Sequence, residues 1–104
     1  EHYKRFKTPP DLFTAGGMAA AIAAVEALKK TGGDTNTEKL IKTMEGMSFD
    51  TPKGKMTFRP QDHQAMQSMF HFKIKVDPAF AWGVPEFVRE IKAEEMNIPV
   101  RNKR

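Results

Sequence analysis

The chain has 104 residues, a length that allows one domain at most. Hydrophobic residues make up 39% of it and charged residues 29%, which is the composition of a folded protein and argues against disorder. It contains no cysteine, which excludes disulfide bonds and Cys-based zinc sites. The net charge is +4, and the basic excess lies mainly at the two ends, in residues 4–7 and 101–104. Because the aromatic residues fall in core-patterned positions, we expect a basic, solvated surface and no nucleic-acid site.

No apolar run approaches the ~20 residues that a membrane span needs. The longest such run, residues 15–28, consists largely of alanine and glycine. The first residues are polar and do not resemble a signal peptide. We therefore expect no membrane-spanning segment.

Two helices are expected within the first 33 residues. The basic and aromatic start could finish a helix, which Pro9 and Pro10 would stop. The next helix is predicted over residues 13–30, where an apolar stripe recurs at spacings of four, three and three residues. Gly32 and Gly33 are expected to end it. The predicted stripe consists of Met18, Ile22, Val25 and Leu28.

A further helix should follow, because Thr35 and Glu38 have the spacing of a capping box. Its inward face would consist of Leu40, Ile41 and Met44, with Gly46 as the C-terminal stop. Residues 51–54, Thr-Pro-Lys-Gly, have the composition of a turn in which the glycine can adopt positive φ.

Two strands and one last helix complete the predicted elements. Met56 and Phe58 alternate with polar residues and predict a short strand. Residues 69–76 alternate strictly, which predicts a strand with one buried and one exposed face. Phe70, Phe72, Ile74 and Val76 would form the buried face. The last helix is predicted from Pro85 to about Met96, with Phe87, Val88 and Ile91 inward.

These elements are too few to make a complete sheet. A two-stranded pair is marginal in water and needs more sheet or a covering helix. The alanine-rich helix is suited to close packing on a larger sheet than this sequence supplies. The pattern therefore predicts an incomplete α/β unit.

Three motifs in order resemble those of one receptor family. Residues 10–21, PDLFTAGGMAAA, resemble a family helix that begins with small residues and a Gly-Tyr-x-Ala core. Residues 45–54 are similar to its G-x-x-F-x-x-P-x-G turn, and residues 58–64, FRPQDHQ, to its F-R-x-x-D-H-Q corner. The chain thus resembles, over nearly its whole length, the C-terminal segment of the type I periplasmic solute-binding proteins of ABC importers.

The resemblance implies an α/β fold that is incomplete without the upstream lobes. Such receptors have two lobes and bind a small solute, here an amino acid or an aromatic carboxylate, as the lobes close. Residues 1–68 would belong to the N-terminal lobe, residues 69–76 would cross between the lobes, and residues 77–104 would pack on the other lobe. Hinges absorb closure in a few backbone torsions, so a crossing strand fits this role.

The resemblance further implies a periplasmic protein that is not an enzyme, needs no cofactor and delivers its solute to a membrane ABC permease. The isolated segment should self-associate through its exposed apolar faces, by exchange of a strand or a helix. It should bind solute weakly or not at all.

Ligand contacts are predicted on the alanine-rich helix. Met18 takes the place of the cleft-facing Tyr of the family motif, and a flexible, polarizable methionine suits an apolar or aromatic ligand. Phe13, earlier on the same helix, is the second predicted ligand-binding residue. The residue pattern alone leaves open a second interpretation, in which Met18 is the first member of a core stripe.

Other chemistry finds less support in the sequence. The three histidines form no pair with helical i, i+4 spacing, and no carboxylate recurs beside them as a set of metal ligands would require, so no metal site is predicted. Asp62 and His63 have no nucleophile nearby, and Asp62 is expected to cap a turn. The alternative hypothesis is a small, self-sufficient basic α+β domain that binds an acidic protein or nucleic acid.

Overall fold

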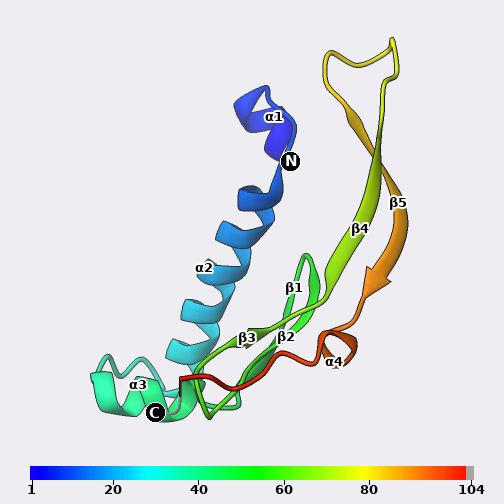
Figure 1. Ribbon diagram of the computed structural model, residues 1–104. Coiled ribbons are helices and arrows are strands. Elements are labelled where there is room, and N and C mark those ends of the chain that lie inside the picture. The colour runs from blue at the N-terminus through cyan, green and yellow to red at the C-terminus, as the bar shows by residue number, and fades with distance from the viewer. Residues whose placement is uncertain (103–104) are drawn as a thin grey trace.

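The computed structural model describes residues 1–102, so Lys103 and Arg104, part of the basic C-terminal end, lie outside the described residues. The chain runs through helices and strands in two separate sheets (Figure 1). In chain order the elements are α1 (His2–Phe6), α2 (Leu12–Lys30), α3 (Thr37–Met44), β1 (Ser48–Thr51), β2 (Gly54–Phe58), β3 (Ala65–Met66), β4 (Met69–Lys75), β5 (Val84–Ile91) and α4 (Ala93–Met96).

Helix α2 confirms the predicted helix over residues 13–30 and begins one residue earlier. Its N-cap is Asp11, whose side chain accepts hydrogen bonds from the backbone N–H groups of Phe13 and Thr14. It ends in a Schellman motif, in which the N–H of Gly33 donates to the carbonyl of Leu28 and that of Gly32 to Lys29. Gly32 and Gly33 both have positive φ, as the predicted helix stop requires.

The buried face of α2 differs from the predicted stripe. Ala19, Ala23 and Ala27 are buried, whereas Met18 and Val25 remain about half exposed. The small alanine side chains let β1 approach the helix closely, and the larger residues therefore lie to one side of the contact. The prediction of Met18, Val25 and Leu28 as the inward face is thus wrong for this part of the fold, although Ile22 packs against the core.

Helix α3 confirms the helix predicted after Gly33, but its N-cap differs from the predicted one. The cap is Asn36, whose side chain accepts a hydrogen bond from the N–H of Lys39 at 3.2 Å. Asp34 accepts from the N–H of Asn36 at 2.9 Å, and this turn places Asn36, one residue after Thr35, at the helix start. The predicted capping box of Thr35 and Glu38 is therefore wrong, because the N-cap lies one residue after Thr35.

The first sheet has the order β1-β2-β3, with both pairings antiparallel. The predicted turn at residues 51–54 joins β1 and β2, and Gly54 has φ 104°, which favours glycine. Phe49 of β1 and Met56 of β2 are opposite each other and both buried. Together with Met47 and the three alanines of α2 they form the core.

The second sheet is the antiparallel hairpin β4–β5. Strand β4 confirms the predicted strand at residues 69–76 to within one residue, but every residue of β4 is exposed because no layer covers it among the described residues. Residues 85–91, predicted as the start of a helix, instead belong to β5, and of the predicted helix from Pro85 to about Met96 only α4 is helical. Pro85 is compatible with β5 because a two-stranded sheet has only edge strands.

The molecule is extended and open. Its radius of gyration is 16.9 Å, whereas about 13 Å is typical of a 100-residue domain. The β4–β5 hairpin reaches away from the first sheet, and its tip returns to α1 through Trp82, whose ring lies 5.6 Å from that of Tyr3 (Figure 1).

One expectation about membranes needs correction. Among the described residues, α2 is long and apolar enough to cross a membrane by length and composition. A core helix passes the same test, and α2 contributes its alanine face to the core. The finding on its own is weak evidence for a span.

Candidate ligand-facing surface

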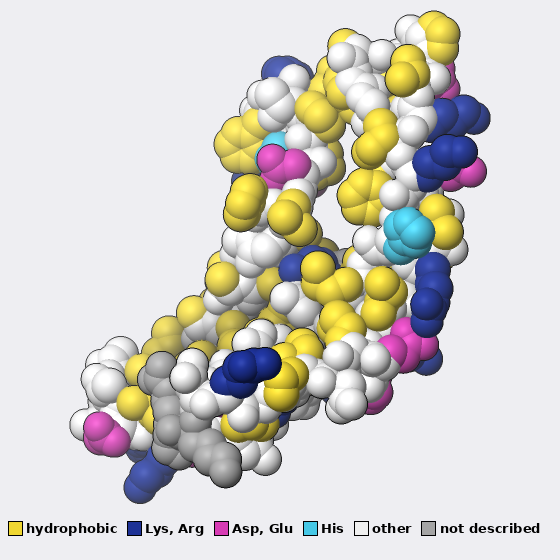
Figure 2. All heavy atoms as spheres, in the orientation of Figure 1, with side chains coloured by type: hydrophobic (Ala, Val, Ile, Leu, Met, Phe, Trp, Pro, Cys, Tyr) yellow, Lys and Arg dark blue, Asp and Glu magenta, His cyan; other side chains and the backbone are white. Residues whose placement is uncertain are grey.

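An open hollow separates α1 and α2 from the β4–β5 hairpin. Figure 2 shows hydrophobic side chains on both sides of this hollow, with Lys and Arg side chains along the opposite edge of the hairpin. The exposed apolar residues of the hairpin include Phe70, Phe72 and Ile74. Apolar side chains gathered in this way are typical of a contact face, whereas single exposed apolar residues are common on any protein surface.

Met18 lies on the exposed side of α2. Its side chain is 55% exposed, so it does not belong to the core of this chain. It lines an open groove of about 300 Å³ along the helix surface. The other lining residues are Ala21, Ile22, Val25, Glu26 and Lys29. The groove has an apolar floor with one acidic and one basic residue, a composition that suits an apolar ligand or packing partner.

Phe13 is in the first turn of α2 and is 81% exposed. At 3.6 residues per turn, Phe13 and Met18 are about 140° apart around the helix axis. The structure therefore places the two predicted ligand-binding residues on one helix but on different sides of it. Whether either residue contacts a solute stays a prediction.

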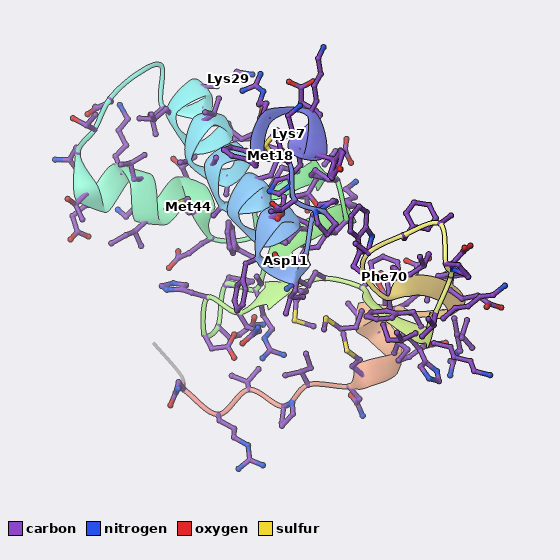
Figure 3. All side chains as sticks on the ribbon, turned by 90° about the horizontal axis from the view of Figure 1, so that it is seen from above. Lys7, Asp11, Met18, Lys29, Met44 and Phe70 are labelled. Carbon is purple, nitrogen blue, oxygen red and sulfur yellow. The ribbon has the colours of Figure 1, made fainter. Side chains whose placement is uncertain are left out.

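The start of α2 carries a firmly ionised carboxylate. The N–H of Thr14 donates to Asp11 at 3.1 Å and that of Phe13 at 2.9 Å. These bonds, that of Thr14 foremost, lower the pKa of Asp11. The Thr14 hydroxyl lies 3.4 Å from Nε2 of His2, and this contact connects α1 to α2. Figure 3 shows Asp11 at the start of α2 and Met18 further along the same helix.

The corner after β2 confirms the structural interpretation of Asp62. Its carboxylate accepts from the N–H of Gln64 at 3.2 Å and pairs with Arg59, with Nε–Oδ1 and Nη2–Oδ2 distances of 2.8 and 2.6 Å. The Arg59 hydrogen bonds lower the pKa of Asp62, and the same bonds raise the pKa of Arg59. Neighbouring His63 contacts Glu45, with Nε2 3.0 Å from Oε1.

Arg59 also contacts the end of the chain, which was not predicted from the sequence. Its Nη1 donates to the carbonyl of Ile98 at 2.6 Å, across 39 residues of sequence. No short motif can indicate so distant a partner. A hollow of about 570 Å³ nearby, between β2 and the end of β5, was also not predicted. Charged residues of both signs line it, among them Lys55, Glu90 and Lys92.

Metal ligands do not gather anywhere in residues 1–102. In that range no group of three His, Cys, Asp or Glu residues could hold an ion. His2 is in α1, His63 is in the corner after β2, and His71 is on β4.

Comparison with known proteins identifies the class. A family model described as periplasmic binding protein matches residues 1–79, which is most of the chain. The chain belongs to this family, and the predicted resemblance is confirmed. Its α/β helices and strands are accordingly part of the periplasmic-binding-protein fold. No curated protein matches the chain.

Three solved structures from Rhodopseudomonas palustris place the chain more narrowly. An ABC-type branched-chain amino acid transporter of strain CGA009 is 67% identical with a TM-score of 0.89, covering 99% of this chain and 28% of that one. An ABC transporter is 68% identical with a TM-score of 0.60, covering 78% and 24%. A solute-binding protein of strain BisB5, in complex with 3,4-dihydroxybenzoic acid, is 26% identical with a TM-score of 0.77, covering 88% and 25%.

The chain therefore spans about a quarter of the length of the solved proteins that it matches. All three relatives belong to ABC transporters, and the BisB5 protein is a solute-binding protein. Nothing in the comparisons supports the alternative of a basic domain that binds an acidic protein or nucleic acid.

Proposed function

We propose that this chain is the C-terminal part of a periplasmic receptor that captures an amino acid or an aromatic carboxylate for an ABC importer. The observation that carries the proposal is the 67% identity, over 99% of the chain, to an ABC-type branched-chain amino acid transporter. The more distant relative with bound 3,4-dihydroxybenzoic acid supports aromatic carboxylates as the second solute class. The receptor performs no chemistry on its solute and hands it to a membrane permease.

The open architecture suggests how the chain is divided. Residues 1–68 contain α1 to α3 and the first sheet, and would belong to one lobe. Residues 69–76 contain β4, which leaves that sheet and would cross between the lobes. Of residues 77–104, β5 and α4 would pack on the other lobe, whereas the described tail, residues 97–102, returns to the first sheet, where Arg59 donates to the carbonyl of Ile98 at 2.6 Å.

In this arrangement Met18 and Phe13 would both line the cleft, from different sides of α2. Met18 is half exposed beside an apolar groove, and Phe13 is almost fully exposed at the helix start. A methionine can adapt its shape to aliphatic and aromatic solutes alike. The groups that hold the charged ends of the solute would come from the remainder of the receptor.

The isolated chain should associate with itself. Within residues 1–102 the core consists of six buried residues, three of them alanines, while large apolar side chains of α2 and of the β4–β5 hairpin face solvent. In the receptor these faces would be covered by the lobes. Without the lobes, a second copy can cover them by exchange of a helix or strand.

A chimera tests the proposal directly. The matching segment of the CGA009 protein is replaced with this chain, and binding of branched-chain amino acids and aromatic carboxylates is measured by calorimetry. We expect a folded chimera that binds a solute of these classes. Met18→Ala should weaken binding about tenfold, since it removes an apolar contact from the pocket.

The control is the same substitution at Met96, a residue of α4, which should leave affinity unchanged. A chimera that folds with the parent's thermal stability but binds neither class of solute would contradict the proposal. An intact affinity in Met18→Ala would remove Met18 from the cleft and leave the receptor assignment standing.

A further inference from the structure

The tail after α4 is attached to the first sheet through one side chain. Residues 97–102 run back from α4 past the corner that follows β2 (Figure 1). Arg59, which directly follows β2, donates from Nη1 to the carbonyl of Ile98 at 2.6 Å and from Nη2 to that of Pro99 at 3.4 Å. These bonds join positions 39 and 40 residues apart.

Arg59 is held in place for this contact. Its backbone N–H donates to the carbonyl of Gln64 at 2.9 Å, and its own carbonyl accepts from the N–H of His63 at 2.8 Å. The carboxylate of Asp62 accepts two hydrogen bonds from the guanidinium, one from Nε at 2.8 Å and one from Nη2 at 2.6 Å. The side chains of Arg59 and Asp62 are 15% and 9% exposed, so solvent screens this pair less than a surface pair.

The contact between the tail and Arg59 determines how the base of the β4–β5 hairpin is attached to the first sheet. Strand β4 begins three residues after β3, so one end of the hairpin is fixed to the first sheet covalently. Strand β5 continues through α4 into the tail, and Met69 at the start of β4 pairs with Ile91 at the end of β5. Among the described residues, the hydrogen bonds that link the tail to the corner of the first sheet are those from Arg59 to the carbonyls of Ile98 and Pro99.

We propose that Arg59 and Asp62 form a clamp that fastens the tail at Ile98 and Pro99 to the first sheet and thereby fixes the base of the β4–β5 hairpin at two points. Asp62 is a positioning residue that orients the guanidinium, and Arg59 makes the contact with the tail. The inference does not require the chain to bind a solute. If the proposed function holds as well, the clamp would limit how far a crossing hairpin can swing as the lobes close.

The clamp needs arginine specifically. A guanidinium is planar and can donate along two edges at once, here to a carboxylate on one side and to two carbonyls on the other. A lysine ammonium keeps the charge but cannot reproduce this fork. Arg59→Lys therefore separates the proposed geometry from simple charge attraction.

Electron paramagnetic resonance of a labelled tail tests the clamp in the full chain. Because the chain has no cysteine, Arg101→Cys gives one attachment site for a nitroxide, on an exposed residue of the tail. In the parent chain we expect a restricted label. In Arg59→Lys the ratio of docked to released tail should fall at least about tenfold, which a mobile spectral component reports.

Arg89→Lys is the matched control, because Arg89 pairs with Glu95 at 2.9 Å in an exposed position of β5. This variant should leave the label restricted. Asp62→Asn should release the tail partly, since the amide retains a hydrogen-bond acceptor but loses the charge.

Two results would overturn the clamp. One is a label that is already mobile in the parent chain, a measurement that needs no variant at position 59 and holds even if Arg59→Lys does not fold. The other is a label equally restricted in Arg59→Lys and Arg89→Lys, with the circular dichroism of both variants unchanged.

Discussion

Aspartates organise three turns of this chain. Asp11 caps α2, Asp34 closes the turn before α3, and Asp62 orients the corner after β2. Their pKa values are all lowered: that of Asp11 mainly by the N–H of Thr14, that of Asp34 by the N–H of Asn36 and that of Asp62 by Arg59. Each carboxylate therefore stabilises the fold only while it is ionised.

This predicts a loss of stability in acid. The folded-state pKa values lie below the unfolded value of about 3.9, so the stabilisation is fully present above that pH and disappears as the pH falls through the lower, folded-state values. Urea unfolding followed by circular dichroism from pH 6 to pH 2 should show this decline. Asp11→Asn keeps the capping oxygen without its titration and should show a smaller decline. Identical pH curves for Asp11→Asn and the parent chain would exclude a contribution of Asp11.

At the scale of single elements, the packing of α2 on β1 depends on small side chains. Ala23 is 5% exposed in this interface, whereas the adjacent Ala24 is exposed. Ala23→Leu would force the helix away from the sheet. We expect a cost of about 1–3 kcal/mol in the free energy of unfolding. Ala24→Leu should change it by less than about 0.5 kcal/mol. Both values follow from urea denaturation, and equal costs would mean that the alanine face is not the packed face.

The elements that the sequence predicted are those whose signals are local. Proline, glycine and strict alternation located α2, the β1–β2 turn and β4. Residues 85–91 were misassigned because Phe87, Val88 and Ile91 have helical spacing. Pairing with β4, a contact between distant residues, overrides that pattern. The alanine face of α2 and the partner of Arg59 likewise depend on tertiary neighbours that no local pattern contains.

At the scale of the whole molecule, the described residues include few buried apolar side chains and many exposed large ones. A core of Ala19, Ala23, Ala27, Met47, Phe49 and Met56 supports a body 52 Å long. Phe70, Phe72, Ile74 and Phe87 of the hairpin stay exposed on a two-stranded sheet, which is marginal in water without a covering layer. The relatives that contain this fold are about four times as long as the segment that matches.

The imbalance predicts that the 11.8 kDa chain self-associates. Light scattering after size exclusion should give a mass that rises with concentration, because association removes apolar surface from water. Val25→Glu places a charge on the exposed apolar side of α2 and should shift the chain toward monomer. Ala24→Glu, one position away, adds the same charge beside that side and should change the mass less. A chain that stays monomeric at every concentration, with a radius of gyration near 16.9 Å, would show that its exposed faces tolerate water and need no partner.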